Sequence, residues 1–102
     1  CRKLAVACGA PVHDLSAAND DLEDVLAVLS VVDRYVGVSN ANTHLRASLA
    51  LPLEVLVANP IEWRWELGER SPWFPTARLY RERPGGDWSA ALARLAADLR
   101  CA

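Results

Sequence analysis

The residues best suited to binding chemistry lie in one short segment, SNANTH, at residues 39–44. Its polar side chains are short hydrogen-bonding groups followed by an imidazole: Ser39, Asn40, Asn42, Thr43 and His44. The segment follows a β-branched run and precedes an Ala- and Leu-rich stretch, which predicts a strand passing into a helix. Free backbone N–H groups at residues 42–44 and the helix dipole would favour an anion there, above all a phosphate group. The same residue types also cap ordinary helices, so a purely structural role is the alternative.

A second candidate is the aromatic segment NPIEWRWELGERSPWFP at residues 59–75. Aromatic rings stack on a nucleobase or a sugar face, and an arginine pairs with a diphosphate. The segment contains both kinds of group: Trp63, Arg64, Trp65, Trp73 and Phe74. The alternative, which we favour for most of the rings, is a hydrophobic lid with Arg64 balanced by neighbouring glutamates. If one residue contacts a ligand, we expect it to be Trp63 or Arg64.

The remaining reactive residue types predict no catalytic residue and no metal site. The acids near the N-terminus are typical of strand ends and helix caps, so none is nominated as a general base: Asp14, Asp20, Asp21, Glu23 and Asp24. Cys1, Cys8 and Cys101 lack the paired spacing of metal ligands, and we interpret them as reduced thiols of a cytoplasmic protein. His13 is interpreted as structural.

The elements that must position these residues alternate between strands and helices. We expect a helix ending at Gly9, strands at 11–15, 34–38, 53–58 and 77–81, and helices at 19–32, 43–51 and after Asp87. Asn19 or Asp20 is expected to cap the helix at 19–32. Strands separated by helices predict an α/β fold, part of a Rossmann-like three-layer domain with a mainly parallel sheet. The predicted core comprises Leu26, Leu29, Val36, Val38, Val55, Val57, Leu92 and Leu95, and Trp88 and Leu99 extend the apolar stripe of the closing helix.

Composition and charge set limits on the class of protein. The chain has 102 residues, 52% of them hydrophobic and 24% charged, which predicts one globular domain with a packed core. A net charge of −2 without a basic stripe argues against binding to nucleic acid or to an anionic membrane. The sequence has no apolar run near the roughly 20 residues that a membrane span requires.

The stretch YVGVSNANTHLRASLALPLEVLVANPIEWRW, followed by SPWFP and RLYRE, resembles a known family. It is similar to the C-terminal domain of heptosyltransferase-like (family 9) glycosyltransferases, and most similar to the version at the end of bacterial tetratricopeptide-repeat proteins. The likeness covers residues 11–100. The usual motif of the family is D-[ST]-x-x-x-H. His44 matches its histidine, whereas Ser39 stands where the acid is expected and Asn40 where the hydroxyl residue is.

This resemblance implies a GT-B fold, in which two Rossmann-like domains enclose a nucleotide-sugar donor held mainly by the C-terminal domain. Residues 1–102 would then be a single, partial nucleotide-sugar-binding domain that lacks two central strands before residue 11. The acceptor site and the general base would come from the remainder of the polypeptide, so the isolated chain should be catalytically silent. No metal or other cofactor is implied, because the nucleotide-sugar is a substrate.

Two further expectations follow from the partial domain. Open edges at the strands 11–15 and 34–38 predict a dimer or larger homo-oligomer, or else a partner segment of the same protein that covers them. A different class of function is also open, because the missing acid in the motif is compatible with a non-catalytic Rossmann-like interaction module attached to a repeat scaffold.

Overall fold

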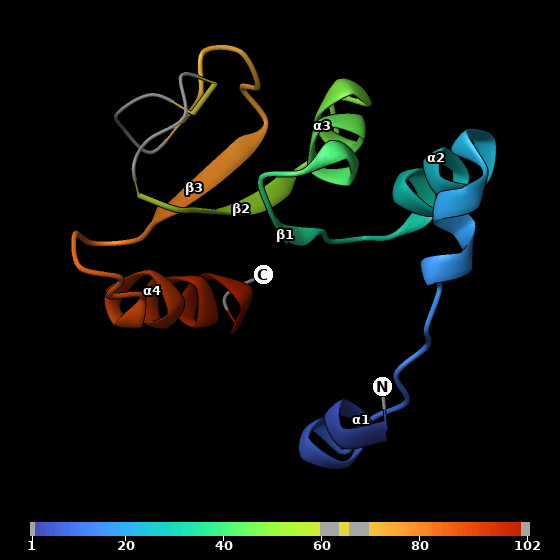
Figure 1. The fold of residues 1–102 in the computed structure, drawn as a ribbon, viewed down its shortest axis with the longest axis horizontal. Helices are drawn as coiled ribbons and strands as arrows, with labels where there is room; N and C mark the ends of the chain where they lie inside the picture. The colour runs from blue at the N-terminus through green and yellow to red at the C-terminus, as the bar shows by residue number, and fades with distance from the viewer. Residues whose placement is uncertain (1, 60–63, 66–69, 101–102) are drawn as a thin grey trace.

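The computed structural model describes residues 2–59, 64–65 and 70–100 of the chain. Their elements alternate between helices and strands, as expected (Figure 1). In chain order they are α1 (Arg2–Cys8), the 3₁₀ helix η1 (Ser16–Asp20), α2 (Leu22–Val31), β1 (Val36–Val38), α3 (Ala41–Ser48), β2 (Leu53–Val57), β3 (Ala77–Arg81) and α4 (Ser89–Arg100). None of the described helices is long and apolar enough to cross a membrane.

The three strands form a parallel sheet in the order β1-β2-β3, which confirms the predicted α/β, Rossmann-like fold class. Val36 of β1 pairs with Glu54 of β2, and Leu53 of β2 pairs with Ala77 of β3. The most apolar strand, β2, is therefore central. Parallel neighbours require crossover connections, and the one between β1 and β2 contains α3.

Alternate residues of the sheet enter two separate hydrophobic cores, because successive side chains of a strand point to opposite faces. One core combines Ala47 of α3 with strand residues and the segment after β2: Leu53, Val55, Val57, Trp65, Ala77 and Leu79. The other joins Tyr80 to α4 and includes Ala91, Leu95, Leu56, Trp88 and Leu99. In Figure 1, α3 and α4 accordingly lie on opposite sides of the sheet. The arrangement is the predicted three-layer sandwich of helix, sheet and helix.

Residues 11–15 do not form the predicted strand. The Asp14 side chain accepts hydrogen bonds from the backbone N–H and the hydroxyl of Ser16, at 3.0 Å and 2.6 Å, and so turns the chain into η1. Asp and Ser two residues apart favour such local turns over a sheet ladder. The two bonds also lower the pKa of the Asp14 carboxyl, because both stabilise its ionised form.

Helix α2 begins later than predicted, at Leu22. Asn19 and Asp20 belong to η1, and it is Asp21 that caps α2 by accepting hydrogen bonds from the N–H groups of Glu23 and Asp24. The predicted caps, Asn19 or Asp20, lie two positions and one position before the actual one, because the preceding 3₁₀ turn includes both residues.

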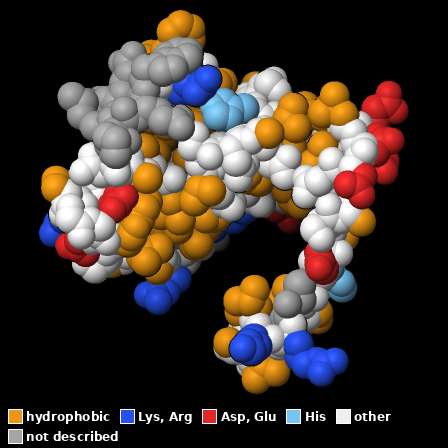
Figure 2. All heavy atoms as spheres, viewed as in Figure 1, with side chains coloured by type: hydrophobic (Ala, Val, Ile, Leu, Met, Phe, Trp, Pro, Cys, Tyr) orange, Lys and Arg blue, Asp and Glu red, His pale blue; other side chains and the backbone are white. Residues whose placement is uncertain are grey.

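Part of the predicted core is exposed. Val36 and Val38 of β1 have 43% and 52% of their surface accessible, and Leu92 of α4 has 49%. The paired positions Glu54 and Leu56 show that the two valines point to the α4 face of the sheet. Helix α4 packs on β3 and covers that face of β1 only in part, so about half of the surface of each valine stays accessible. Figure 2 shows hydrophobic side chains gathered over α4 and the adjoining sheet.

The N-terminal helix stands apart from the sheet (Figure 1). The helix ends at Cys8 and Gly9 follows with φ +64°, which agrees with the predicted glycine stop. None of the residues of α1 is buried, and Leu4 and Val6 are exposed. The described chain therefore consists of a packed three-strand unit and an N-terminal arm with little cover.

Candidate functional site

The site begins where β1 passes into α3. A Cβ at Gly37 would come within 2.7 Å of the Tyr35 hydroxyl oxygen, so a glycine in β1 lets the Tyr35 ring lie across the strand. The Tyr35 hydroxyl then reaches the Thr43 hydroxyl at 2.9 Å. Thr43 Oγ1 in turn donates to the Val38 carbonyl at 2.5 Å. Thr43 is fully buried, so its role is to fix the first turn of α3 against the end of β1.

Asn40 is the N-cap of α3. Its side-chain oxygen accepts a hydrogen bond from Thr43 N at 3.1 Å, and its carbonyl accepts one from His44 N at 3.2 Å. These bonds correct the prediction that the N–H groups of 42–44 are all available to an anion. The donors at this end that bond to no described residue are the N–H groups of Ala41 and Asn42.

His44 presents one unused polar atom beside these donors. Its Nδ1 lies 2.7 Å from the Asn40 carbonyl, which can only accept, so Nδ1 carries a proton. Nε2 is buried and has no hydrogen-bond partner among the described residues. In the neutral ring Nε2 accepts from a ligand hydroxyl; in the doubly protonated ring it donates to a phosphate oxygen. The ring is held by Trp65 and Phe74, whose ring centroids lie 5.5 Å and 5.4 Å away.

Trp65 covers the end of the sheet. It is fully buried, its indole N–H donates to Ser39 Oγ at 3.0 Å, and its carbonyl accepts from Arg81 Nη2 at 2.6 Å. Burial lowers the pKa of the Arg81 guanidinium below its ordinary value. Trp65 thus forms part of a hydrophobic lid, as favoured from the sequence.

The other aromatic candidates differ from one another in exposure. Phe74 packs against the core beside Trp65, whereas Trp73 is exposed. Arg64 is half-buried, and its carbonyl accepts a hydrogen bond from Ser71 Oγ at 2.5 Å. Trp63, one of the two residues predicted from the sequence to contact a ligand, lies outside the described residues.

Asn42 does not point its side chain to the site. Its Nδ2 donates to Asn19 Oδ1 at 2.9 Å, which ties α3 to η1. The structure therefore brings four of the five predicted residues of the SNANTH segment together: Ser39, Asn40, Thr43 and His44. Two of these, Asn40 and Thr43, are occupied in shaping the helix end.

A pocket of about 220 Å³ lies at the carboxyl ends of β1 and β2. Its lining residues come from both strand ends, from the lid and from the start of α4: Val38, Ser39, Leu56, Val57, Ala58, Trp65 and Trp88. Ligands of open parallel sheets bind beyond the carboxyl ends of the strands, so the position is the expected one. Trp88 was predicted only as a core residue; packing against the α4 core leaves part of its surface to line the pocket.

Arg46 is a positioning residue that was not predicted from the sequence. It is fully buried, and its guanidinium donates to the carbonyls of Leu29, Val32 and Pro52. These bonds tie α3 to the end of α2 and to the residue before β2. The available signal was its spacing, since Arg46 lies three residues after the buried Thr43 and so shares the inner face of α3.

The described residues contain no group of three or more His, Cys, Asp or Glu side chains placed to hold a metal ion. What the site offers is two backbone N–H donors at a helix N-terminus, one buried imidazole nitrogen and an aromatic-lined pocket. These groups suit an anion joined to a flat or apolar moiety.

Fold and site together define a Rossmann-like α/β unit with a candidate anion site at its strand ends. The chain is 32% identical over 80 residues to protein FlbA of Caulobacter vibrioides, an alignment that covers 78% of this chain and 13% of FlbA. The chain therefore spans about an eighth of the length of that relative. No family model and no solved structure matches the chain.

Proposed function

We propose that this chain is the donor-binding portion of a glycosyltransferase and holds a nucleotide-sugar through its diphosphate. The observation that carries the proposal is the juxtaposition of the α3 N-terminus, the unpartnered His44 Nε2 and the pocket at the ends of β1 and β2. The resemblance of residues 11–100 to the donor domain of family 9 glycosyltransferases supports the same function.

In this proposal the diphosphate lies at the N–H groups of Ala41 and Asn42, where the helix dipole favours negative charge. His44 Nε2 donates to a phosphate oxygen when the ring is doubly protonated. The nucleoside or the sugar fills the pocket between Trp65 and Trp88. No metal is part of this proposal, because the helix end offsets part of the diphosphate charge.

The chain itself supplies no catalytic residue in this proposal. Among the described residues no Asp or Glu lines the pocket, and in this proposal the general base and the acceptor site belong to the remainder of its polypeptide. We also propose a cytoplasmic location, which the free, exposed thiol of Cys8 supports.

The test is titration calorimetry of the chain with nucleoside diphosphates, comparing His44→Ala with the exposed His13→Ala as a matched control. Loss of a hydrogen bond to a charged group should weaken binding by about 1–2 kcal/mol in His44→Ala, and His13→Ala should bind like the parent chain. Unchanged affinity in a folded His44→Ala protein would remove the assignment.

A non-catalytic interaction module on a repeat scaffold is the second candidate. It is favoured by Ser39, which occupies the place of the motif acid and accepts the Trp65 indole N–H. Its hydroxyl thereby helps to hold the lid in place. Absence of binding by all nucleoside diphosphates at millimolar concentration would support the module over the donor site.

A further inference from the structure

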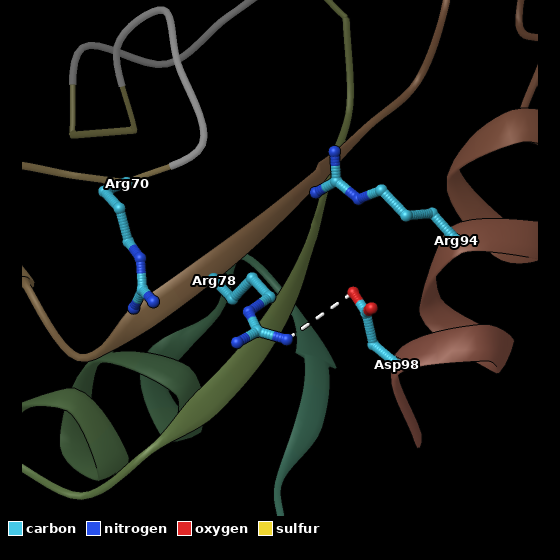
Figure 3. Close-up of a pocket in the computed structure, with 4 residues that line it drawn as sticks. All are labelled: Arg70, Arg78, Arg94 and Asp98. Carbon is cyan, nitrogen blue, oxygen red and sulfur yellow. Dashed lines mark ion pairs between the residues drawn. The ribbon is translucent and has the colours of Figure 1, made fainter. Parts of the chain in front are cut away.

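A second cluster of charged side chains lies away from the strand ends, on the α4 face of β3. Three arginines and one aspartate line a pocket of about 300 Å³: Arg70, Arg78, Arg94 and Asp98. Figure 3 shows the three guanidinium groups converging from separate elements. Arg78 is on β3, Arg94 and Asp98 are on α4, and Arg70 belongs to the segment before β3, where it forms an antiparallel bridge with Arg78.

The arginines are held in place by local contacts. Arg78 Nη1 lies 3.6 Å from Asp98 Oδ2, and the same oxygen accepts a hydrogen bond from the Tyr80 hydroxyl at 2.7 Å. Arg94 lies over the Tyr80 ring, 4.5 Å from its centroid, and donates to the Leu79 carbonyl. Arg70 Nη1 donates to the Pro75 carbonyl at 3.4 Å. Arg94 is thus the best held of the three guanidinium groups, whereas Arg78 and Arg70 have weaker contacts.

Among the described lining residues, three arginines and one aspartate leave an excess of two positive charges. Convergent guanidinium groups repel one another unless an anion lies between them. Arginine forks match the oxygen geometry of phosphate and carboxylate groups. An ionised phosphate carries nearly two negative charges and so matches the excess.

A second pocket of about 370 Å³ shares Arg70 and Arg78 with the first. Its other lining residues are Pro52, Leu53, Glu54, Pro75 and Thr76. The hydroxyl oxygen of Thr76 is buried without a hydrogen-bond partner among the described residues. A buried polar atom in that state is costly unless a ligand satisfies it. The second pocket thus has room and a polar contact for an organic group attached to the phosphate.

We propose that Arg70, Arg78 and Arg94 form a binding site for a phosphate group, separate from the site at the N-terminus of α3. The phosphate lies among the three guanidinium groups, and the organic part of a phosphate ester extends past Arg70 and Arg78 toward Glu54 and Thr76. The proposal stands independently of the donor site, since the two share no residue.

The same contacts also fasten α4 to β3, so the experiment must separate binding from folding. Binding of inorganic phosphate and of glycerol phosphate to the 102-residue chain is measured by calorimetry at pH 7.5 and constant ionic strength. Arg70→Ala is the principal variant, because the single hydrogen bond of its side chain is long and its removal disturbs the fold least. Arg78→Gln is the second, and Arg83→Ala, an exposed arginine outside the pocket, is the control.

Phosphate binding should weaken about tenfold or more in Arg70→Ala and Arg78→Gln and stay unchanged in Arg83→Ala. If glycerol phosphate binds more tightly than inorganic phosphate, and Thr76→Val removes the difference, the ligand is an ester; equal binding assigns free phosphate. Two results would overturn the proposal: no detectable phosphate binding at about 10 mM, the weak limit of a specific site, or equal binding by all three arginine variants.

Discussion

The neighbouring strands β1 and β2 have similar apolar sequences and very different surroundings. Val55 of β2 is fully buried, whereas Val36 and Val38 of β1 are about half exposed. Strand β2 pairs on both sides and has α3 on one face and the α4 core on the other. Strand β1 pairs on one side, and α4 covers it only in part. The cover supplied by neighbouring elements, and not the apolar character of a strand, therefore decides its burial.

The other edge strand, β3, shows that an edge position alone does not expose a strand. Ala77, Leu79 and Tyr80 are all buried, because α4 packs on β3 and the α3-side core takes its alternate residues. Arg94 also reaches from α4 to the Leu79 carbonyl. The two edges of the same sheet thus differ in whether a helix covers them.

The largest expected effect is the difference between two matched valine truncations. Val55→Ala should cost about 2–3 kcal/mol of unfolding free energy, because it removes buried methyl groups and leaves a cavity. Val38→Ala should cost less than about 0.5 kcal/mol, as is usual for exposed positions. Urea denaturation of both variants, at a concentration low enough for the chain to be monomeric, measures the difference. Similar costs for the two would mean that β1 is covered in solution.

Self-association is the second way to sharpen the comparison. An apolar strand with an open edge and an open face invites pairing with another chain, so we expect a dimer or larger assembly of the 102-residue chain by light scattering. Val38→Lys should weaken association about tenfold or more, because the new charge cannot be buried unpaired. The control is Arg83→Lys, which keeps the charge of an exposed turn residue and should associate like the parent chain. A chain that is still monomeric at a protein concentration of about 1 mM, the weak limit of specific pairing, would contradict this expectation.

The smallest expected effect concerns the covered edge. Tyr80→Phe should cost about 1 kcal/mol, the usual net value of one hydrogen bond, because the Tyr80 hydroxyl donates to Asp98. Burial, and then this hydrogen bond, raise the pKa of Tyr80 above its ordinary value of about 10. The folded chain therefore holds the phenol proton more tightly than the unfolded chain does.

The raised pKa gives the prediction a pH dependence with a definite sign. The stabilisation is fully present below pH about 10 and is lost as the pH rises through the higher pKa of the folded state. Stability of the parent chain should thus fall more steeply above pH about 10 than that of Tyr80→Phe. Denaturation midpoints from pH 8 to 11 measure the two slopes, and parallel slopes would contradict the assignment.

The sequence predicted the elements better than it predicted their surroundings. Periodicity located β2, β3 and the helices, but the helix predicted at 43–51 begins two residues earlier, because Asn40 caps α3 at Ala41. The strand at 11–15 was wrong because the local Asp14–Ser16 hydrogen bonds outweigh a weak apolar pattern. The exposure of β1 could not be predicted, since it depends on where α4 ends up relative to the sheet.

The site was predictable only in its local part. The hydrogen bonds within the SNANTH segment join residues close in sequence, and the residue types indicate these bonds. The contacts from Trp65 to Ser39 and from Arg46 to Leu29 join residues far apart in the chain. The arginine pocket likewise draws on three elements. Such contacts follow from the crossover topology, and the sequence does not show which distant residues they join.

The parallel register has a consequence for how the chain folds. Strand β2 pairs with Val36–Val38 before it and with Ala77–Arg81 after it, and neither partner is joined to it by a hairpin. Non-local pairing of this kind is slow, because loop closure precedes the gain from contact. During synthesis β2 leaves the ribosome before β3 and α4 exist. Until β3 and α4 emerge, the most apolar strand of the chain has an unpaired edge and an uncovered face. It is the segment that a chaperone would bind first.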